Sequence, residues 1–260
     1  MGMAAGLAFD TIAKDYDARW TSSTVGRLQR AAVWRHIDPL VKPGDRILDL
    51  GCGTGEDALH LMQHCGAVVQ GVDASVEMIE VAQARGVDAR QLTIEAFADL
   101  PRNRRRRESG GAVFAGALSN FGALNCVRDL EKVALALGHL IRPGGYLAIC
   151  VMGARCAWEI GYFLLHGDLT KAFRRWRPNG APSSLGIRVS YHSLAHLRHA
   201  FHPWFRLTRW CGIGLCVPPS YVKPLSASAL ARLAKIDARV AGWPFLRAIA
   251  DHRLLLFERL

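Results

Sequence analysis

Three glycines alternate with other residues in the segment LDLGCGTGE, residues 48–56. Glycine loses more backbone freedom on folding than other residues, so three of them close together indicate that something must approach the backbone closely. They follow an apolar run, and helical spacing begins after them. Where a strand turns into a helix, free N–H groups and the helix dipole favour a polar or anionic ligand. The segment therefore predicts a binding loop.

An acidic residue further along the chain sharpens this prediction. Asp73 closes the next apolar run, AVVQGVD, and lies 20 residues after Gly53. A carboxylate at that place can accept hydrogen bonds from both hydroxyls of a ribose. The glycine spacing is G-x-G-x-G, and Glu56 stands where the dinucleotide pattern G-x-G-x-x-G needs a glycine. Together these features indicate a ligand with a ribose but without a pyrophosphate.

Alternating strands and helices must position these residues. The apolar runs predict strands at 46–50, 67–73, 87–94, 111–119, 146–152, 187–191, 205–214 and 253–259. Periodic spacing predicts helices at 10–20, 25–38, 56–64, 75–86, 129–141, 155–177, 193–201 and 226–243. Strands that alternate with helices are typical of a parallel sheet covered on both faces, an α/β fold.

Five segments in this order resemble the class I S-adenosylmethionine (SAM) dependent methyltransferases of the small-molecule type. They are ILDLGCGTG (47–55), GVDASVEMI (71–79), IEAFADLP (94–101), ALSNFGALNCV (117–127) and LIRPGGYLAICVM (140–152). The resemblance implies a Rossmann-like, mostly parallel seven-stranded sheet with helices on both faces. It also implies SAM as the cofactor and S-adenosylhomocysteine as its product; no metal is expected, because the histidines late in the chain lack metal-ligand spacing. The chain departs from many relatives at Ala115, where they carry an aspartate.

The resemblance also suggests a division of the chain. Residues 1–40 are expected to form a helical cover, 41–152 the SAM-binding core, and 153–192 a lid over the substrate. Residues 193–260 are expected to complete the sheet, with a helical insertion at 218–250.

Roles for single residues follow from the same resemblance. The glycine loop would hold the methionine part of SAM, and Asp73 with its neighbours would bind the ribose and the adenine. The segment after the fourth strand would face the sulfonium. The expected cofactor-binding residues are Tyr16, Gly51, Cys52, Gly53, Asp73, Ala74, Met78, Glu95, Ala96, Phe97, Ser119, Asn120 and Phe121. The expected catalytic residues are Tyr16, Asn120, His166 and His192, of which either histidine could be a general base. Cys126 and Cys156 leave open a site that methylates a thiol or a metalloid.

The segment 152–177 has two interpretations. Its stripe of Leu169, Phe173 and Trp176 lies beside the basic residues Lys171, Arg174 and Arg175. An apolar stripe with a basic flank is typical of a helix at a membrane surface. It also fits a lid that packs its apolar face on the protein and turns its basic side to water.

Charge and composition bear on partners and location. The net charge of +11 lies wholly within residues 153–260, because basic and acidic residues are equal in number before them. Such a field attracts anions. The seven cysteines form no C-x-x-C pair, and no apolar run is long enough to span a membrane. The first residues lack a basic start, so we do not expect them to act as a secretory signal. We therefore expect a cytoplasmic protein, with peripheral membrane contact left open.

The arginine-rich tract RNRRRR, residues 102–107, is predicted to be a solvated loop at the end of the sheet opposite the cofactor. No specific nucleic-acid partner is expected, because the segment SNFG after the fourth strand lacks the motif of base methyltransferases. The histidines that cluster late in the chain lack metal-ligand spacing.

These observations predict methyl transfer to the oxygen or nitrogen of a small, anionic metabolite, such as one of specialised metabolism. Two alternatives stay open: a lipid-headgroup methyltransferase at a membrane surface, and a SAM-binding regulatory protein without catalysis.

Overall fold

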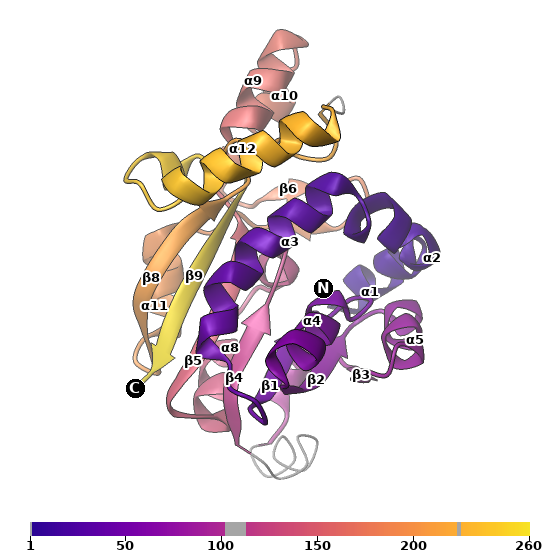
Figure 1. Cartoon of the computed structure of the whole chain (residues 1–260), viewed down its shortest axis with the longest axis vertical. Coiled ribbons are helices and arrows are strands. Elements are labelled where there is room, and N and C mark those ends of the chain that lie inside the picture. Colours follow the sequence, from indigo (N-terminus) through magenta and orange to yellow (C-terminus); the bar gives the residue numbers. More distant parts are fainter. Residues whose placement is uncertain (1, 102–112, 223–224) are drawn as a thin grey trace.

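A computed structural model describes residues 2–101, 113–222 and 225–260 (Figure 1). The arginine-rich tract 102–107 and the first residues of the expected strand 111–119 lie outside this part. The described residues contain a seven-stranded sheet in the order β3-β2-β1-β4-β5-β9-β8. Its strands are β1 (Arg46–Leu50), β2 (Val68–Asp73), β3 (Asp88–Gln91), β4 (Phe114–Ser119), β5 (Ile141–Met152), β8 (Phe205–Ile213) and β9 (His252–Arg259).

The sheet is parallel from β3 to β5, and β9 runs antiparallel to both β5 and β8. This confirms the mostly parallel seven-stranded sheet. The chain steps outward from β1 to β2 and β3, and then returns to the other side of β1 as β4. In open α/β sheets ligands bind at the carboxyl ends of the strands beside such a reversal. The glycine loop follows β1, so the topology brings it to that place.

Helices cover both faces, as expected, and each face has its own core. Buried side chains of α3 (Thr24–Ile37), α4 (Glu56–Cys65) and α5 (Val76–Ala84) form one core with the sheet. Those of α6 (Ile94–Asp99), α8 (Leu130–Leu140) and α11 (Leu194–Phe201) form the other. Serine caps begin three of these helices: Ser23 accepts from the Gly26 N–H, Ser75 from the Met78 N–H and Ser193 from the His196 N–H.

The N-terminal cover is divided more finely than expected. Instead of one helix over 10–20, the chain forms α1 (Gly2–Asp10), α2 (Ala13–Tyr16) and a π turn, η1 (Asp17–Thr21). The carboxylate of Asp10 accepts from Ser75 Oγ and from the Glu77 N–H, which ties the end of α1 to the start of α5. The prediction of a continuous helix was wrong because this contact with α5 lies outside the local pattern.

The segment after β5 also differs from its prediction. The expected helix 155–177 is replaced by α9 (Ala157–Leu165), α10 (Leu169–Ala172) and a 3-10 turn, η4 (Arg174–Trp176). Gly167, with φ of +72°, separates the two helices in a conformation that favours glycine. The expected strand 187–191 is reduced to β7 (Arg188–Val189), which pairs with β6 (Ala181–Pro182).

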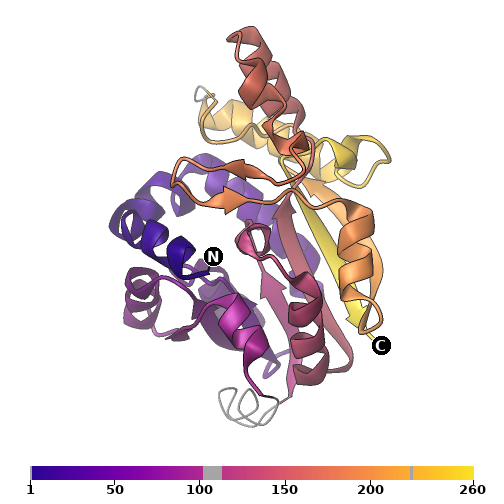
Figure 2. The ribbon, with the colours of Figure 1, turned by 180° about the vertical axis from the view of Figure 1, so that it is seen from behind.

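The hairpin β6–β7 lies across the carboxyl ends of the parallel strands, close to the N-terminal helices (Figure 2). Asn125, in the turn η3 (Ala123–Cys126), fixes it there. The Asn125 carbonyl accepts from the Ser190 N–H at 2.8 Å, and its side-chain amide donates to the Ser190 carbonyl at 2.6 Å. The same amide's oxygen accepts from the Met152 N–H, so the hairpin is tied to the end of β5.

Beyond this edge of the sheet lie α9, α10 and α12 (Ala227–Val240), followed by the turn η5 (Leu246–Ala248) (Figure 1). None of the helices in the described part of the chain is long and apolar enough to cross a bilayer.

Candidate cofactor and substrate site

A cavity of about 280 Å³ opens where the glycine loop, the N-terminal helices and the hairpin β6–β7 meet. The described residues that line it come from regions far apart in the sequence. They are Ala5, Phe9, Tyr16, Gly51, Gly53, Asp73, Ala74, Met78, Thr93, Ile94, Glu95, Asn120, Phe121, Gly122, Ala123, Cys126, Val127, Met152, Ser183, Ser184, Leu185, Ile187 and Val189.

The two glycines of the loop that line the cavity serve different purposes. Both have positive φ, +76° at Gly51 and +54° at Gly53. A Cβ on Gly51 would lie only 2.3 Å from the Cβ of Ala123, whereas a Cβ on Gly53 would meet nothing within 4 Å. Gly51 is thus required by packing within the protein. Gly53 leaves open space at the cavity, as a backbone does that a ligand approaches closely.

Asp73 holds the loop and still faces the cavity. Its Oδ2 accepts from the Gly53 N–H and its Oδ1 from the Ser75 N–H, each at 2.9 Å. Burial raises the pKa of Asp73, and these two backbone donors together with that of Ala74 oppose the rise. Each carboxylate oxygen can accept more than one hydrogen bond, so the residue keeps acceptor capacity for a ligand.

A second acid lies beneath the loop with an unmet hydrogen bond. Asp49 is 1% exposed, and its Oδ2 has no partner among the described residues. Burial raises the pKa of this carboxyl well above its usual range, and the charge of Asp57 adds to the rise. A buried polar atom without a partner is costly, so it marks a position where a donor from a ligand or a water fits.

A buried polar network supports the wall behind Asn120. The carboxylate of Asp57 accepts from an Arg30 guanidinium nitrogen, from Trp34 Nε1 at 2.7 Å and from Asn120 Nδ2 at 3.1 Å. Asn120 Oδ1 in turn accepts from the Phe121 N–H. Both ends of the Asn120 amide are therefore occupied within the protein, which suits a residue that positions the loop after β4 rather than one that transfers protons.

Tyr16 places a phenol at the cavity. Burial, partly offset by the charge of Arg30, raises its pKa to about 12. The hydroxyl is therefore neutral near pH 7 and can donate a hydrogen bond. The turn that follows Tyr16 is fixed by Asp17, which accepts from Thr54 Oγ1 at 2.7 Å and from the guanidinium of Arg85.

Most residues expected to contact the cofactor are brought together here. Tyr16, Gly51, Gly53, Asp73, Ala74, Met78, Glu95, Asn120 and Phe121 all line the cavity. Four expected residues do not lie among its lining in the described chain. Ala96 lies exposed on the outside of α6, and Phe97 is buried in the core. Cys52 packs against Gly71, and Ser119 Oγ donates to the Leu50 carbonyl.

The sequence-based list missed several lining residues. Thr93 and Ile94 lie one turn before the expected Ala96 and Phe97, and the Thr93 cap of α6 is the signal that could have placed them. The residues of η3 directly follow the expected Phe121. Those of α1 and of the hairpin carry no local signal, because only the tertiary fold brings them to the cavity.

The two expected catalytic histidines lie elsewhere in the described structure. His166 is exposed, its Nδ1 lies 2.7 Å from the Tyr162 carbonyl, and it borders a separate groove between α9 and α12. His192 lies just beyond the hairpin rather than in the lining. Burial lowers the pKa of its ring, the Leu124 carbonyl accepts a hydrogen bond from the ring, and Nε2 is buried without a partner among the described residues.

Two of the three basic residues expected on the flank of the lid, Arg174 and Arg175, are directed toward a buried acid, whereas the third, Lys171, is exposed. Arg174 and Arg175 each place two nitrogens within 3.1 Å of the carboxylate of Glu159, which is only 1% exposed. Arg175 also donates to Asp251 at 2.6 Å. These arginines hold α9, η4 and the start of β9 together, so they are not available to an anionic acceptor.

Of the two cysteines considered for a site that methylates a thiol or a metalloid, only one lies at the cavity. Cys126 lines the cavity, but burial raises the pKa of its thiol to about 11. Cys156 is buried at the start of α9, where its sulfur accepts from the Glu159 N–H. Neither thiol is ionised near neutral pH, and the thiolate is the reactive form.

This fold and site define the class of Rossmann-like α/β proteins that bind a nucleoside at the turn after β1. Comparison with known proteins narrows the class. A family model described as a methyltransferase domain matches residues 26–203. The chain therefore belongs to the SAM-dependent methyltransferases of class I, and the cofactor of this family is SAM.

Two relatives illustrate the similarity. A demethylmenaquinone methyltransferase of Corynebacterium kroppenstedtii is 32% identical over 149 residues, which cover 55% of this chain and 57% of that protein. An uncharacterized methyltransferase of Emericella nidulans is 38% identical over 209 residues, which cover 66% of this chain and 72% of that protein. The chain thus spans little more than half the length of the first relative.

Solved structures share the fold at low identity. A SAM-dependent methyltransferase of Thermotoga maritima superposes with a TM-score of 0.61 and 17% identity, covering 98% of this chain and 99% of that one. Geranyl diphosphate C-methyltransferase from Streptomyces coelicolor superposes with a TM-score of 0.55 and 16% identity, covering 90% and 81%.

The site residues fit SAM. Gly53 leaves room for a ligand against the backbone, and Asp73 has acceptors for a ribose. The unpartnered carboxyl oxygen of Asp49 lies behind the described lining of the cavity, where a water could connect it to the ammonium group of the methionine part. These matches rest on geometry, and the roles of the single residues toward the cofactor remain predictions.

Proposed function

We propose that this chain transfers the methyl group of SAM to an oxygen or nitrogen of a small molecule with a largely apolar body. The observation that carries the proposal is the single cavity that joins two unlike regions. Asp73 and Gly53 lie at one side, and Leu185, Ile187 and Val189 of the hairpin contribute an apolar wall. Such a cavity can hold a cofactor and an acceptor side by side.

The protein's share of the reaction is binding and alignment. SAM, when bound, supplies a methyl group already activated on a sulfonium. The described residues would hold it through Asp73, Gly53 and Asp49, with Met78 and Ala74 beside the adenine. Tyr16 and Phe121 would close the site around the methyl group. Because methyl transfer needs aligned reactants and little water, positioning and desolvation supply most of the rate.

The lining favours an uncharged acceptor over the anionic one expected from composition. Among the described residues that line the cavity, the charged side chains are Asp73 and Glu95, and there is no lysine or arginine. Arg174 and Arg175, two of the basic residues expected to flank the lid, are engaged by Glu159 and Asp251. An anionic acceptor would therefore meet acids without a compensating cation. The 32% identical relative named for demethylmenaquinone is in line with an acceptor of another kind.

A general base is needed when the acceptor is a hydroxyl, and we propose His192 for that role. Its pKa is lowered by burial, so the ring is neutral near pH 7, and Nε2 is free to take a proton. The proton would pass through a water or after a small movement of the hairpin, because the ring lies behind the cavity wall. An amine acceptor needs no such base.

The test uses the hairpin. Ile187→Asp should leave SAM affinity unchanged and abolish turnover, because the change places a charge in the acceptor half only. Leu165→Asp, on the exposed end of α9, is the control and should keep both properties. Products are detected by transfer of labelled methyl from SAM to a panel of apolar alcohols, phenols and amines. Full turnover by Ile187→Asp would contradict the proposed acceptor wall, and SAM binding without any turnover across the panel favours the non-catalytic alternative.

A second candidate is an acceptor taken from a membrane surface, and one observation favours it. Leu165, the last residue of α9, is 88% exposed, and Phe245, between α12 and η5, is 87% exposed. Figure 1 shows α9 and α12 at the same end of the molecule. The exposed charges of α12 are all basic, namely Arg232, Lys235 and Arg239. Its acid, Asp237, is buried and accepts from the N–H groups of Cys216 and Val217. Exposed apolar tips with basic neighbours are typical of proteins at anionic membranes.

Vesicle binding separates the two candidates. Sedimentation with anionic vesicles should bring down the wild type and should fall with added salt, while neutral vesicles should bind less. Phe245→Ser should weaken binding to the anionic vesicles, and Leu135→Ser, an exposed position on α8, is the control. Equal recovery with and without vesicles would exclude the membrane-bound candidate.

A further inference from the structure

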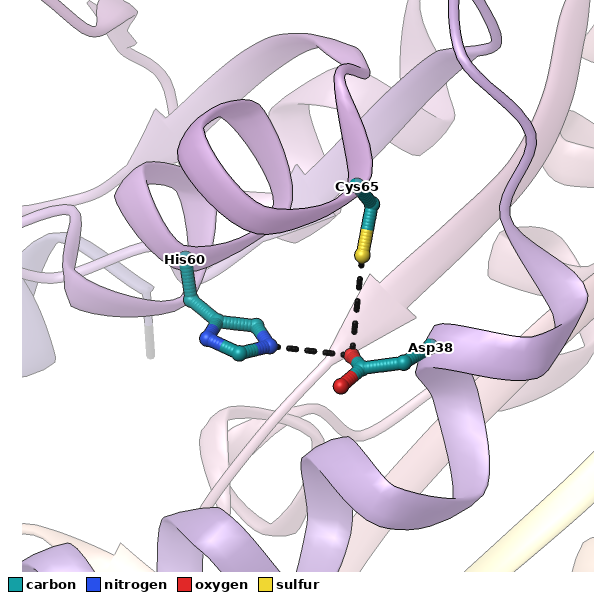
Figure 3. A group of neighbouring side chains, drawn as sticks. All are labelled: Asp38, His60 and Cys65. Carbon is teal, nitrogen blue, oxygen red and sulfur yellow. Dashed lines mark hydrogen bonds and ion pairs between the residues drawn. The ribbon is translucent and has the colours of Figure 1, made fainter.

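A cluster of three potential metal ligands lies away from the cavity, where α3 and α4 end. Asp38 directly follows α3, and His60 and Cys65 lie on α4. The imidazole and the thiol both point at the Asp38 carboxylate (Figure 3). His60 Nε2 lies 2.9 Å from Asp38 Oδ1, and Cys65 Sγ lies 3.7 Å from the same oxygen. The three ligand atoms lie within 4.8 Å of one another.

We propose that Asp38, His60 and Cys65 bind a divalent cation of the zinc type, with water as the fourth ligand. Zinc bonds of about 2.0–2.3 Å in a tetrahedron place neighbouring ligand atoms about 3.3–3.7 Å apart. The two distances to the Asp38 oxygen, 2.9 and 3.7 Å, lie within a few tenths of an ångström of that spacing, and the His60 nitrogen and Cys65 sulfur, within 4.8 Å of each other, would close on the cation by side-chain rotation. A mixture of thiolate, imidazole and carboxylate suits zinc better than magnesium or calcium, which prefer oxygen ligands.

The surroundings favour a cation at this point. Asp38 is the C-terminal cap of α3, and Cys65 is the last residue of α4, so two helices direct their C-termini at the cluster. Helix C-termini carry partial negative charge and stabilise cations. The site is also accessible, because the Asp38 side chain is 36% exposed and that of His60 is 11% exposed.

A buried hydroxyl beside the cluster gives independent support. Tyr146 Oη is buried and has no hydrogen-bond partner among the described residues. Burial raises the pKa of this phenol, and the charges of Asp45, Cys65 and Asp38 raise it further, which places the phenol within electrostatic reach of the cluster. A water on the cation would give that hydroxyl a partner.

The imidazole is held in place before any cation binds. The His60 ring stacks on Trp34 with centroids 3.8 Å apart and an interplanar angle of 4°. Trp34 is itself fixed by its hydrogen bond to Asp57, in the network behind the cavity. A cation would therefore join α3 to α4 at one end, while Arg30 and Asp57 join the same helices near the cavity. The inferred role is structural and does not depend on the proposed methyl transfer.

This site differs from the histidines considered in the sequence. The expectation of no metal rested on the spacing of the late histidines, none of which contributes here. His60 and Cys65 are five residues apart on one helix, and Asp38 comes from a separate segment. Only the packing of α3 against α4 brings the three together.

The test is spectroscopic. Purified protein is treated with a chelator, dialysed and titrated with Co²⁺, which replaces zinc in such sites. We expect one equivalent to produce thiolate-to-cobalt absorption in the near ultraviolet together with visible bands of a four-coordinate ion. Zn²⁺ should displace Co²⁺ and raise the midpoint of thermal unfolding, because a ligand that binds only the folded state stabilises it.

Matched variants assign the ligands. Cys65→Ser should abolish the charge-transfer band. His60→Ala and Asp38→Asn should weaken Zn²⁺ binding by more than about 100-fold, because removing a residue that only hydrogen-bonds to a metal ligand already weakens binding by up to about 100-fold. Cys216→Ser is the control, because its thiol also lies beside a carboxylate, that of Asp237, outside the cluster. A wild type without the cobalt bands would overturn the proposal, as would bands that survive in Cys65→Ser. Since the first of these results needs no variant, a misfolded variant leaves the test intact.

Discussion

The carboxylate of Asp73 is the residue on which the cofactor assignment depends most directly. Asp73→Asn keeps the size of the side chain but replaces one acceptor oxygen with an N–H₂ donor. That donor must face either the Gly53 N–H or the Ser75 N–H, each now 2.9 Å from an oxygen, or the ribose. A hydrogen bond to a charged group contributes about 1.5–3 kcal/mol. The affinity for SAM should therefore fall about 10- to 150-fold, since each 1.4 kcal/mol is a factor of ten.

The assay is calorimetric titration with SAM and with S-adenosylhomocysteine. A ligand that lacks the ribose 2′-hydroxyl adds the second arm of a double-mutant cycle. Removing the hydroxyl should lower the affinity of the wild type about as much as the Asp73→Asn substitution lowers its affinity for SAM. The same removal should change the affinity of the Asp73→Asn variant little. Asp88→Asn, on the exposed edge of β3, is the matched control and should bind like the wild type. A folded Asp73→Asn variant with wild-type affinity, or two effects that simply add, would refute the placement of the ribose.

Four further substitutions test other parts of the structure. Gly53→Ala should lower the free energy of unfolding by about 1–2 kcal/mol, because its backbone is left-handed, and it should bind SAM more weakly, because the added methyl group enters the cavity. Gly51→Ala should lower the free energy of unfolding further, because its added methyl group meets Ala123. Glu159→Gln should lower the free energy of unfolding in urea at pH 7 by about 1.5–3 kcal/mol, since it removes the counter-charge of Arg174 and one of the two counter-charges of the buried Arg175, which keeps Asp251. Burial lowers the pKa of His36 to about 4, so protonation between pH 6.5 and 4 favours the unfolded chain. The wild type should therefore lose about 1 kcal/mol of stability when the pH falls from 6.5 to 4, and His36→Gln should not show this loss.

Controls follow from the same structure. Gly86→Ala carries the same left-handed strain, with φ of +85° and an open Cβ position, outside the lining of the cavity; it should keep SAM affinity. Burial alone would raise the pKa of Glu159, but the hydrogen bonds of Arg174 and Arg175 hold it below its ordinary value. Its contribution is thus present above about pH 4 and lost as the pH falls through that lowered pKa. The stability difference from Glu159→Gln should shrink in acid, and a constant difference would contradict this reasoning.

For His36, the exposed His199 offers the comparison. His199→Gln should leave the pH dependence of unfolding as it is in the wild type. A His36→Gln variant whose stability still falls between pH 6.5 and 4 by the full wild-type amount would show that another group titrates there.

The parts of the fold that depend on local pattern were predictable. Strands such as β1 and β2 are short apolar runs, and the glycine loop and Asp73 come directly after them, so their place at the carboxyl edge of the sheet follows from the α/β alternation. The helix expected over 155–177 was predicted from apolar periodicity. It is divided because Gly167 takes a left-handed conformation and because Arg174 and Arg175 turn inward to Glu159 and Asp251.

The site was only partly predictable for a related reason. Residues that follow a strand, such as Gly53 and Asn120, were placed correctly at the cavity edge by the sequence. Around α6 the expected contact positions fell at Ala96 and Phe97, one helical turn beyond the lining residues at the start of that helix. The hairpin residues Leu185 and Ile187 come from a segment with weak local preference, and Asn125 determines where they lie. Contacts of this kind depend on the tertiary fold.

The central claim is that the cavity beside the glycine loop binds SAM. The measurement that tests it most directly is a calorimetric titration of the purified wild-type protein with SAM and with S-adenosylhomocysteine. We expect saturable binding of both ligands at a single site, and we expect S-adenosylhomocysteine that is already bound to prevent the binding of SAM. A folded protein that binds neither ligand would contradict the claim.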